Sequence, residues 1–258
     1  MADAAPPPPV PWWRTERPLL GGWSTLGGPL APELMAATGF AWVCLDQQHG
    51  AYPASALVPS LQAVDAGGAR ALVRVAWNET AAISFALDAG ADGAIVPMVD
   101  DADAARRAVA AARYPPAGAR SWGPVRAQLR TPGFAPASAD ADVLLLVMVE
   151  TAAACDAAPE ILAVPGVDGI FIGPNDLALS LGEPRTPDPA PAVRERIEGV
   201  LEAAGERGAV TGIYCSGADA VARWAAAGFD LLSAGADGSL LAAAAADALS
   251  AARAAAGG

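Results

Sequence analysis

The sequence contains no lysine. All 16 of its basic side chains are arginines, spread along the chain from Arg14 to Arg253. A lysine Schiff base with a carbonyl substrate or with pyridoxal phosphate is therefore excluded. A P-loop of the Walker type is excluded as well, because its motif requires a lysine. Chemistry that needs a positive centre must take it from arginine, from backbone dipoles or from a bound metal.

Cysteine is also scarce, and basic side chains are outnumbered by acidic ones. The three cysteines, Cys44, Cys155 and Cys215, are odd in number and far apart in the sequence. This pattern is typical of free thiols in a reducing compartment, and we expect a cytoplasmic protein. A net charge of -12 argues against a nucleic-acid or anionic-membrane partner. No apolar run is long enough to span a bilayer, and no signal-peptide pattern opens the chain.

The first 18 residues differ in composition from the remainder. They include Pro6-Pro7-Pro8-Pro9, which predicts a flexible, proline-rich arm over residues 1–18. From residue 19 onward, short apolar runs alternate with longer amphipathic segments rich in alanine. The predicted strands are 19–24, 41–46, 70–75, 93–97, 143–150, 168–173, 209–214 and 230–234. The predicted helices are 29–38, 54–67, 79–90, 101–113, 153–163, 190–207 and 217–227.

Eight strands that alternate with helices predict parallel pairing through right-handed crossovers. In a chain of 258 residues this pattern favours a (β/α)8 TIM barrel over residues 19–258, a single domain with an extra C-terminal helix over 240–257. A doubly wound open sheet is the alternative, but no glycine-rich dinucleotide fingerprint follows an early strand. Two segments, 114–141 and 174–189, interrupt the alternation, and we expect them to serve function or subunit contacts.

Charged side chains follow four of the predicted strands, at the end where barrels carry their active sites. Asp46 and His49, the only histidine, follow the second strand, and Arg74 ends the third. Glu150 follows the fifth strand, and Asp176 follows the sixth. Charges are costly to bury unless they are paired or bind a metal. The sequence therefore predicts that these side chains meet in one site.

Each group has a role in that site and a simpler alternative. Asp46 can orient the His49 imidazole for proton transfer, whereas a surface histidine in a turn is the alternative. Glu150 and Asp176 offer hard oxygen ligands to Mg²⁺ or Mn²⁺, whereas helix capping is the alternative for both. Trp23, at the end of the first strand, either walls the site or belongs to the core.

Several stretches resemble the metal-dependent class II pyruvate aldolases, the family of 4-hydroxy-2-oxoheptanedioate and related hydroxy-ketoacid aldolases. The resemblance covers about residues 22–238, and Gly173-Pro174-Asn175-Asp176-Leu177, with Glu150 upstream, is its most specific part. The other matching stretches are 39–50, which holds Asp46-Gln47-Gln48-His49-Gly50, and 72–75, 93–98, 114–121 and 149–151.

The resemblance implies a carbon–carbon lyase that reversibly cleaves 4-hydroxy-2-keto acids to pyruvate, or hydroxypyruvate, and an aldehyde through a metal-stabilised enolate. Oxaloacetate decarboxylation would be a side activity. Glu150 and Asp176 would bind a divalent cation (Mg²⁺, Mn²⁺ or Co²⁺), and Arg74 would stabilise the enolate oxygen. Backbone amides of Gly173 and Asn175 would hold the substrate carboxylate, and His49 with Asp46 would move the proton. A homohexamer, built partly through C-terminal helices, is also implied.

Two positions depart from the family pattern. Many relatives carry Gly-Glu between the aspartate and the histidine, where this chain has Gln47 and Gln48. A glutamine often precedes the metal glutamate by two residues, where this chain has Met148. The departures affect the proton path and the choice of aldehyde. Two other functions stay open: an acyl-CoA ester lyase of the citryl- or malyl-CoA type, which the lack of lysine disfavours, and a non-catalytic barrel that binds a small acid.

Overall fold

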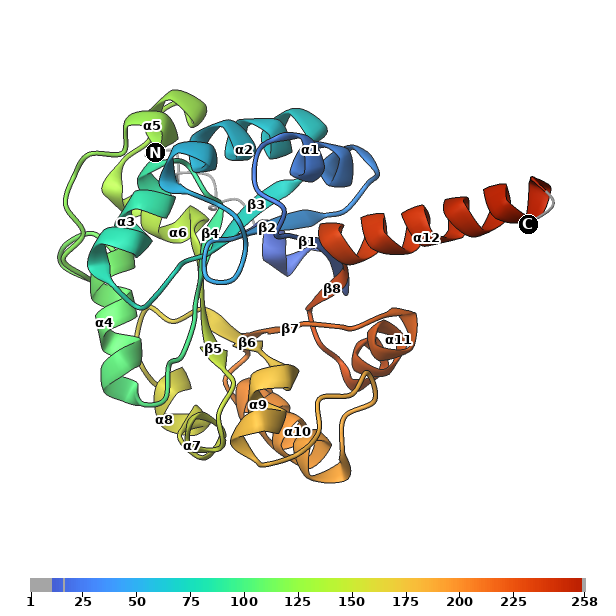
Figure 1. The fold of residues 1–258 in the computed structure, drawn as a ribbon. Helices are drawn as coiled ribbons and strands as arrows, with labels where there is room; N and C mark the ends of the chain where they lie inside the picture. The colour runs from blue at the N-terminus through green and yellow to red at the C-terminus, as the bar shows by residue number, and fades with distance from the viewer. Residues whose placement is uncertain (1–10, 16, 257–258) are drawn as a thin grey trace, which may run out of the picture.

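The computed structural model, which describes residues 11–15 and 17–256, is a closed barrel of eight parallel strands in the order β1 to β8 (Figure 1). Each strand pairs with the next along the chain, and β8 closes the barrel against β1. The strands are β1 (Leu19–Ser24), β2 (Trp42–Asp46), β3 (Arg70–Arg74), β4 (Gly93–Val96), β5 (Leu144–Val149), β6 (Gly169–Ile172), β7 (Val210–Ile213) and β8 (Leu231–Ala236).

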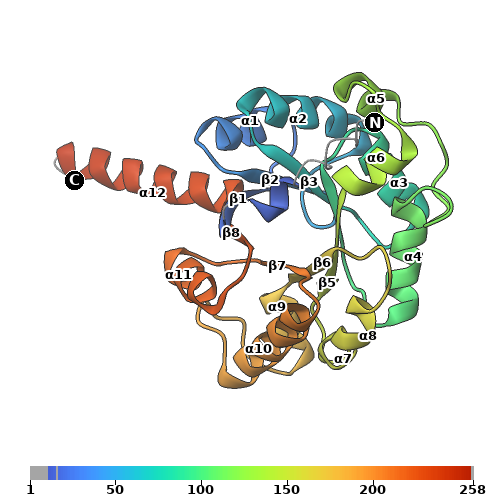
Figure 2. The same ribbon diagram turned by 180° about the vertical axis from the view of Figure 1, so that it is seen from behind.

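Helices surround the barrel, as the view from behind shows (Figure 2). The longer ones are α1 (Leu30–Ala37), α2 (Ala54–Gly67), α3 (Thr80–Asp88), α4 (Ala102–Ala112), α10 (Pro191–Glu206), α11 (Ala218–Ala227) and α12 (Asp237–Ala255). The shorter ones are α5 (Val125–Arg130), α6 (Pro136–Asp142), α7 (Ala152–Asp156), α8 (Ala158–Leu162) and α9 (Pro174–Ser180).

The predicted barrel is confirmed, and all eight predicted strands exist with ends that shift by a residue or two. The differences concern short helices. The predicted helix over 153–163 is broken into α7 and α8, and α5, α6 and α9 lie in the two segments that interrupted the alternation. These helices have five to seven residues, too few for an apolar period of 3.6 to be recognised.

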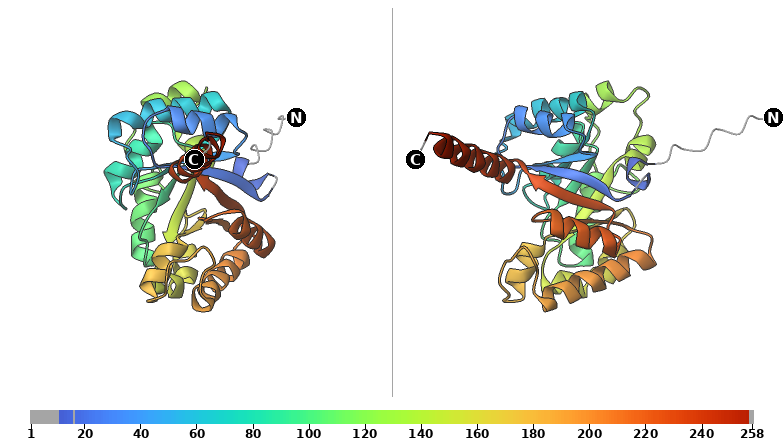
Figure 3. Two further views of the ribbon diagram at one scale, coloured as in Figure 1. Left: turned by 45° about the vertical axis from the view of Figure 1, so that its right-hand side comes forward. Right: turned by 90° about the vertical axis from the view of Figure 1, so that its right-hand side faces the viewer.

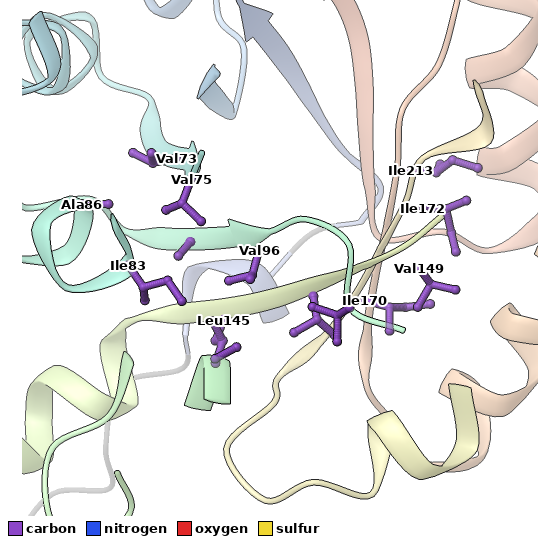
Figure 4. Packing of buried hydrophobic residues seen from close by; sticks show 14 of the residues in the cluster. Val73, Val75, Ile83, Ala86, Val96, Leu145, Val149, Ile170, Ile172 and Ile213 are labelled. Carbon is purple, nitrogen blue, oxygen red and sulfur yellow. The ribbon is translucent and has the colours of Figure 1, made fainter. Parts of the chain in front are cut away.

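Side chains along each strand alternate between the barrel interior and the layer beneath the helices. The strands are apolar on both faces because both of these environments are buried. On β2, Trp42 and Cys44 point into the interior cluster, whereas Val43 and Leu45 join the cluster beneath the helices. Figure 4 shows the outer cluster, where strand residues such as Val96 pack near Ile83 and Ala86 of α3. Both layers are buried, and a shift of one residue would exchange the side chains of the two layers. Burial therefore fixes the register of every strand and the position along the barrel axis at which each strand ends.

A glycine on β1 makes room for the largest interior side chain. A Cβ at Gly21 would lie 1.9 Å from the Trp42 ring, so the fully buried indole occupies space that any other residue would take. At the amino end of the barrel, Trp12–Arg14 form a 3-10 helix and Trp13 is 3% exposed. Residues 1–10 of the predicted arm lie outside the described part of the chain.

Helix α12 leaves the barrel after β8 and extends away from the other helices (Figures 1 and 3). Its first residue, Asp237, is buried and accepts hydrogen bonds from the Ser24 hydroxyl and from the backbone amides of Thr25 and Leu26. Burial alone would raise the pKa of Asp237, but these hydrogen bonds outweigh it and lower the pKa. The start of α12 is thereby tied to the end of β1. Among the described helices, none is long and apolar enough to cross a membrane.

Candidate active site

The predicted site residues meet at the carboxyl ends of the strands, around a cavity of about 350 Å³ that we call the carboxyl-end pocket. Every residue predicted for the site lines this pocket except Glu150, which is 1% exposed. The lining residues are Trp23, Thr25, Asp46, His49, Arg74, Met148, Gly173, Pro174, Asn175, Asp176, Arg185 and Tyr214. Residues from six different strands, or from the segments after them, therefore converge, as barrel geometry requires.

Asp46 and Arg74 form a two-point ion pair on neighbouring strands. They stand opposite each other in the β2–β3 register, and Arg74 donates from Nε at 2.9 Å and from Nη2 at 2.5 Å to the two carboxylate oxygens. Trp23 Nε1 donates to Asp46 Oδ2 at 3.1 Å. Burial would raise the pKa of Asp46, but the hydrogen bonds and charge of Arg74 outweigh it and lower the pKa. The pair stays ionised and holds the guanidinium in one orientation.

The contact between Asp46 and His49 differs from the one expected. Asp46 Oδ1 accepts hydrogen bonds from the backbone amides of Gln48 and His49, at 3.0 and 3.1 Å. In the described chain no hydrogen bond joins the carboxylate to the imidazole. The physical reason is that Arg74, Trp23 and the two amides already use both carboxylate oxygens. Asp46 thus shapes the turn that carries His49, whose side chain is exposed at the pocket.

Glu150 is a buried carboxylate held by one backbone amide. Its Oε1 accepts a hydrogen bond from the Met98 amide at 2.8 Å, and Met98 has a φ of 53°, in the left-handed region that favours glycine. Burial raises the pKa of Glu150 to about 7; the Met98 amide opposes this shift, and the charge of Asp176 adds to it. Glu150 does not cap the following helix, because the Thr151 side chain fills that position and accepts from the Ala154 amide.

Gly173 allows Glu150 and the start of α9 to come together. A Cβ at Gly173 would lie 2.6 Å from Oε2 of Glu150 and 3.2 Å from Cε of Met148. Gly173 is the N-cap of α9, with Pro174 as its first residue and Asp176 in the first turn. No side-chain capping bond is formed at this helix start. Gly173 thus allows the first turn of α9, which carries the Asp176 carboxylate, to start beside Glu150. A larger residue at this position would force Glu150 or the start of α9 to move.

The donor set fits a divalent cation in part. Glu150 and Asp176 are hard oxygen ligands, which Mg²⁺ and Mn²⁺ prefer, and the raised pKa of Glu150 reflects its burial and the nearby charge of Asp176. No group of three or more His, Cys, Asp or Glu side chains gathers in a metal-binding arrangement within the described residues. A cation held here would therefore take further ligands from water or from a substrate.

Three pocket residues, Thr25, Arg185 and Tyr214, and the nearby Met98 escaped sequence reasoning. Tyr214 directly follows β7 and Thr25 directly follows β1, so the rule that located Arg74 applies to both, but neither carries a charge. Met98 has no sequence signal, because its role depends on its backbone conformation. Arg185 lies in the loop between α9 and α10, well beyond the end of β6. The other long segment, 114–141, contributes no residue to the pocket.

A cavity of about 410 Å³ lies at the opposite end of the barrel, where the strands begin. Its lining includes Trp12 and the arginines Arg70 and Arg130, both of which pair with Asp92. It contains none of the residues that the sequence predicted for the site. Cavity size alone therefore does not locate the chemistry, whereas the strand ends do.

Comparison with known proteins shows the family to which the chain belongs. The family model described as HpcH/HpaI aldolase/citrate lyase matches residues 20–244. A hydroxypyruvate/pyruvate aldolase of Rhizorhabdus wittichii is 40% identical over 94% of this chain and 97% of its own. A 4-hydroxy-2-oxo-heptane-1,7-dioate aldolase of Shigella flexneri is 37% identical over 89% of this chain and 86% of its own.

A crystal structure has the same barrel. It is that of a HpcH/HpaI aldolase/citrate lyase family protein from Burkholderia cenocepacia, with a TM-score of 0.87 at 32% identity. The similarity covers 94% of this chain and 97% of that one. The match extends from β1 into α12 and includes all the strand ends that form the carboxyl-end pocket. The chain therefore belongs to the HpcH/HpaI aldolase/citrate lyase family.

Proposed function

We propose that the protein is an aldolase that reversibly cleaves 4-hydroxy-2-keto acids to pyruvate, or hydroxypyruvate, and an aldehyde. The observation that carries the proposal is the Asp46–Arg74 pair, which fixes a guanidinium at the pocket that Asp176 also lines, with the buried Glu150 close enough to Asp176 for their charges to interact. Relatives that share 37–40% of their residues with the chain are named as aldolases of this kind.

Glu150 and Asp176 would hold a divalent cation, Mg²⁺, Mn²⁺ or Co²⁺. When bound, the cation supplies a Lewis acid for the keto and carboxylate oxygens of the substrate. The chain prepares for it in two ways: Gly173 leaves room beside Oε2 of Glu150, and the Met98 amide occupies Oε1. In the absence of lysine, no Schiff base can serve as the alternative electron sink.

The remaining pocket residues would bind the 2-keto acid and stabilise its enolate. Arg74 points a fixed positive charge toward the position where the enolate oxygen develops, and a preorganised charge of this kind lowers the barrier. Backbone amides of Gly173 and Asn175, at the start of α9, would receive the carboxylate. Trp23 walls the pocket and steadies Asp46 through its indole N–H.

His49 would transfer the proton that aldol cleavage requires. Its side chain is exposed at the pocket and is the only imidazole in the sequence. The 4-hydroxyl group loses a proton as the carbon–carbon bond breaks, and the enolate gains one to give pyruvate. Asp46 contributes by fixing the turn before His49, and a water between the imidazole and the substrate would complete the path.

The test measures pyruvate released from a 4-hydroxy-2-keto acid by purified protein, before and after chelation, and then with each cation added back. We expect release that stops with chelator and returns with Mg²⁺, Mn²⁺ or Co²⁺. Release that persists after thorough removal of metal would contradict the roles of Glu150 and Asp176. Failure with every 4-hydroxy-2-keto acid and every cation would contradict the aldolase itself.

We also propose that the chain assembles into a hexamer through α12. This helix has 19 residues and extends from the barrel with Leu240, Leu241 and Leu249 about half exposed or more. An isolated helix gains most of its stability from packing an apolar face. A second copy of the chain that covers these leucines would supply that packing.

A further inference from the structure

Arg185, which lines the carboxyl-end pocket, forms no salt bridge with any residue that the structure describes. It lies in the loop between α9 and α10, is exposed, and lines the pocket together with Asp176 and Tyr214. Within the described residues no carboxylate comes within salt-bridge distance of its guanidinium, although Asp188 of the same loop pairs with Arg194 and Arg223. Arg185 thus lines the pocket with a charge that no carboxylate of the described residues neutralises.

The other charges of the pocket are already committed. Arg74 and Asp46 neutralise each other in their two-point pair. Asp176, with Glu150 beneath it, is assigned to the divalent cation and the keto acid. Arg185 is therefore the positive charge of the pocket lining that remains for a second reactant.

Tyr214 adds a neutral donor to the lining of the same pocket. Its ring packs edge-on against Trp23, with 5.6 Å between ring centroids, which limits its movement. Its hydroxyl makes no hydrogen bond within the part of the chain that the structure describes, and burial raises its pKa, so it stays protonated at neutral pH. A hydroxyl and a guanidinium that line one pocket can together bind an anionic group.

We propose that Arg185, assisted by the Tyr214 hydroxyl, is a specificity-determining residue that selects acceptor aldehydes with a carboxylate or phosphate at the end remote from the carbonyl. The inference rests on the proposed aldolase function. It assigns Arg185 to the aldehyde and not to the keto acid, whose carboxylate the proposed function assigns to Gly173 and Asn175. Because the side chain is exposed, its effect is an attraction that salt screens.

The experiment measures kcat/KM for aldol addition of pyruvate to matched aldehydes. Succinic semialdehyde is compared with butanal, and glyceraldehyde 3-phosphate with glyceraldehyde, for the wild type, Arg185→Gln and Arg185→Lys. We expect Arg185→Gln to lower kcat/KM for the anionic aldehydes roughly tenfold, the size typical of a partly screened charge, and to leave the neutral aldehydes unchanged. Arg185→Lys should retain most of the preference. The anionic aldehyde whose kcat/KM falls more in Arg185→Gln shows whether carboxylate or phosphate is the favoured group.

Two controls separate this inference from the function on which it rests. Arg207→Gln removes the same charge from an exposed arginine outside the pocket and should leave all four aldehydes unchanged. Exchange of pyruvate methyl protons with deuterated water, followed by NMR, reports enolate formation without any aldehyde. Arg185→Gln should exchange at the wild-type rate.

The outcomes that overturn the proposals differ. Three results for Arg185→Gln would overturn the role of Arg185 while leaving the aldolase in place. They are an equal fall in kcat/KM for charged and neutral aldehydes, no fall in kcat/KM for either, and slower exchange of the pyruvate protons. A wild-type protein that neither exchanges pyruvate protons with any of the three cations nor consumes any aldehyde would overturn the aldolase function itself.

Discussion

Asp46 and Arg74 occupy directly opposed positions in the β2–β3 ladder, and their side chains meet in a bidentate pair at the carboxyl end of the barrel. The strand register alone brings them together, so the pair is built into the fold. Asp46 is 1% exposed and Arg74 is 8% exposed. A buried guanidinium that loses its carboxylate is left as an uncompensated charge.

Asp46→Asn should therefore destabilise the protein and disable the site. Removal of one partner of a buried pair costs on the order of 3–5 kcal/mol, and Arg74 would no longer be held in place. Urea denaturation followed by circular dichroism measures the first effect, and pyruvate release measures the second. Asp103→Asn, which breaks the exposed Asp103–Arg106 pair, is the control that should leave both unchanged. A stability of Asp46→Asn within about 1 kcal/mol of wild type, less than a buried pair costs to break, would contradict the prediction.

Gly173→Ala tests the close approach of α9 to Glu150. The added Cβ would lie 2.6 Å from Oε2 of Glu150, so the carboxylate or the start of the helix must move. We expect weaker binding of Mn²⁺ by calorimetry and a large loss of pyruvate release. Gly199→Ala is a matched control, because a Cβ there meets no atom within 4 Å, and alanine within α10 should raise stability slightly. Mn²⁺ binding by Gly173→Ala equal to that of wild type would argue against metal at Glu150.

The sequence predicted the barrel and most of the site because both follow from simple regularities. Apolar strands with helices between them imply the barrel, and the strand ends locate Asp46, Arg74 and Glu150 without further information. What it did not predict depends on three-dimensional detail. The amide of Met98 reaches Glu150 only because its backbone is left-handed. Arg185 lies in a proline-rich loop, and no pattern in the sequence predicts that this loop reaches the pocket. Asp46 accepts a hydrogen bond from the backbone amide of His49, whereas the sequence predicted a contact with the imidazole.

Helix α12 offers a test of assembly. Leu241 and Leu249 are 61% and 51% exposed, and glutamate at both positions would place charge in any interface that covers the helix. We expect light scattering to show a hexamer for wild type and a smaller species for the double variant Leu241→Glu, Leu249→Glu. Ala192→Glu, at the exposed start of α10, adds negative charge elsewhere and should not change the mass. A hexamer that survives both leucine substitutions would place the contacts outside α12.

Glu150→Gln should change stability in a pH-dependent way when metal is removed. Burial raises the pKa of Glu150 from 4.5 to about 7 in the folded protein, so folding favours the protonated carboxyl. The stability gained from the protonated Glu150 carboxyl is fully present below pH 4.5 and is lost as the pH rises through 7. Glutamine mimics the protonated form and still accepts from the Met98 amide. In chelator, Glu150→Gln should match wild type near pH 4.5 and exceed it by roughly 3 kcal/mol at pH 8.

Urea titrations of both proteins at the two pH values measure this difference, and all other titrating groups cancel in the comparison. Glu160→Gln, which removes an exposed charge from α8, should show no such dependence on pH. A divalent cation competes with the proton for Glu150, so Mg²⁺ or Mn²⁺ should stabilise wild type more at pH 8 than at pH 5.5 and should have little effect on Glu150→Gln. A stability difference between wild type and Glu150→Gln that is the same at both pH values would mean that Glu150 does not carry the buried charge on which the proposed cation site depends.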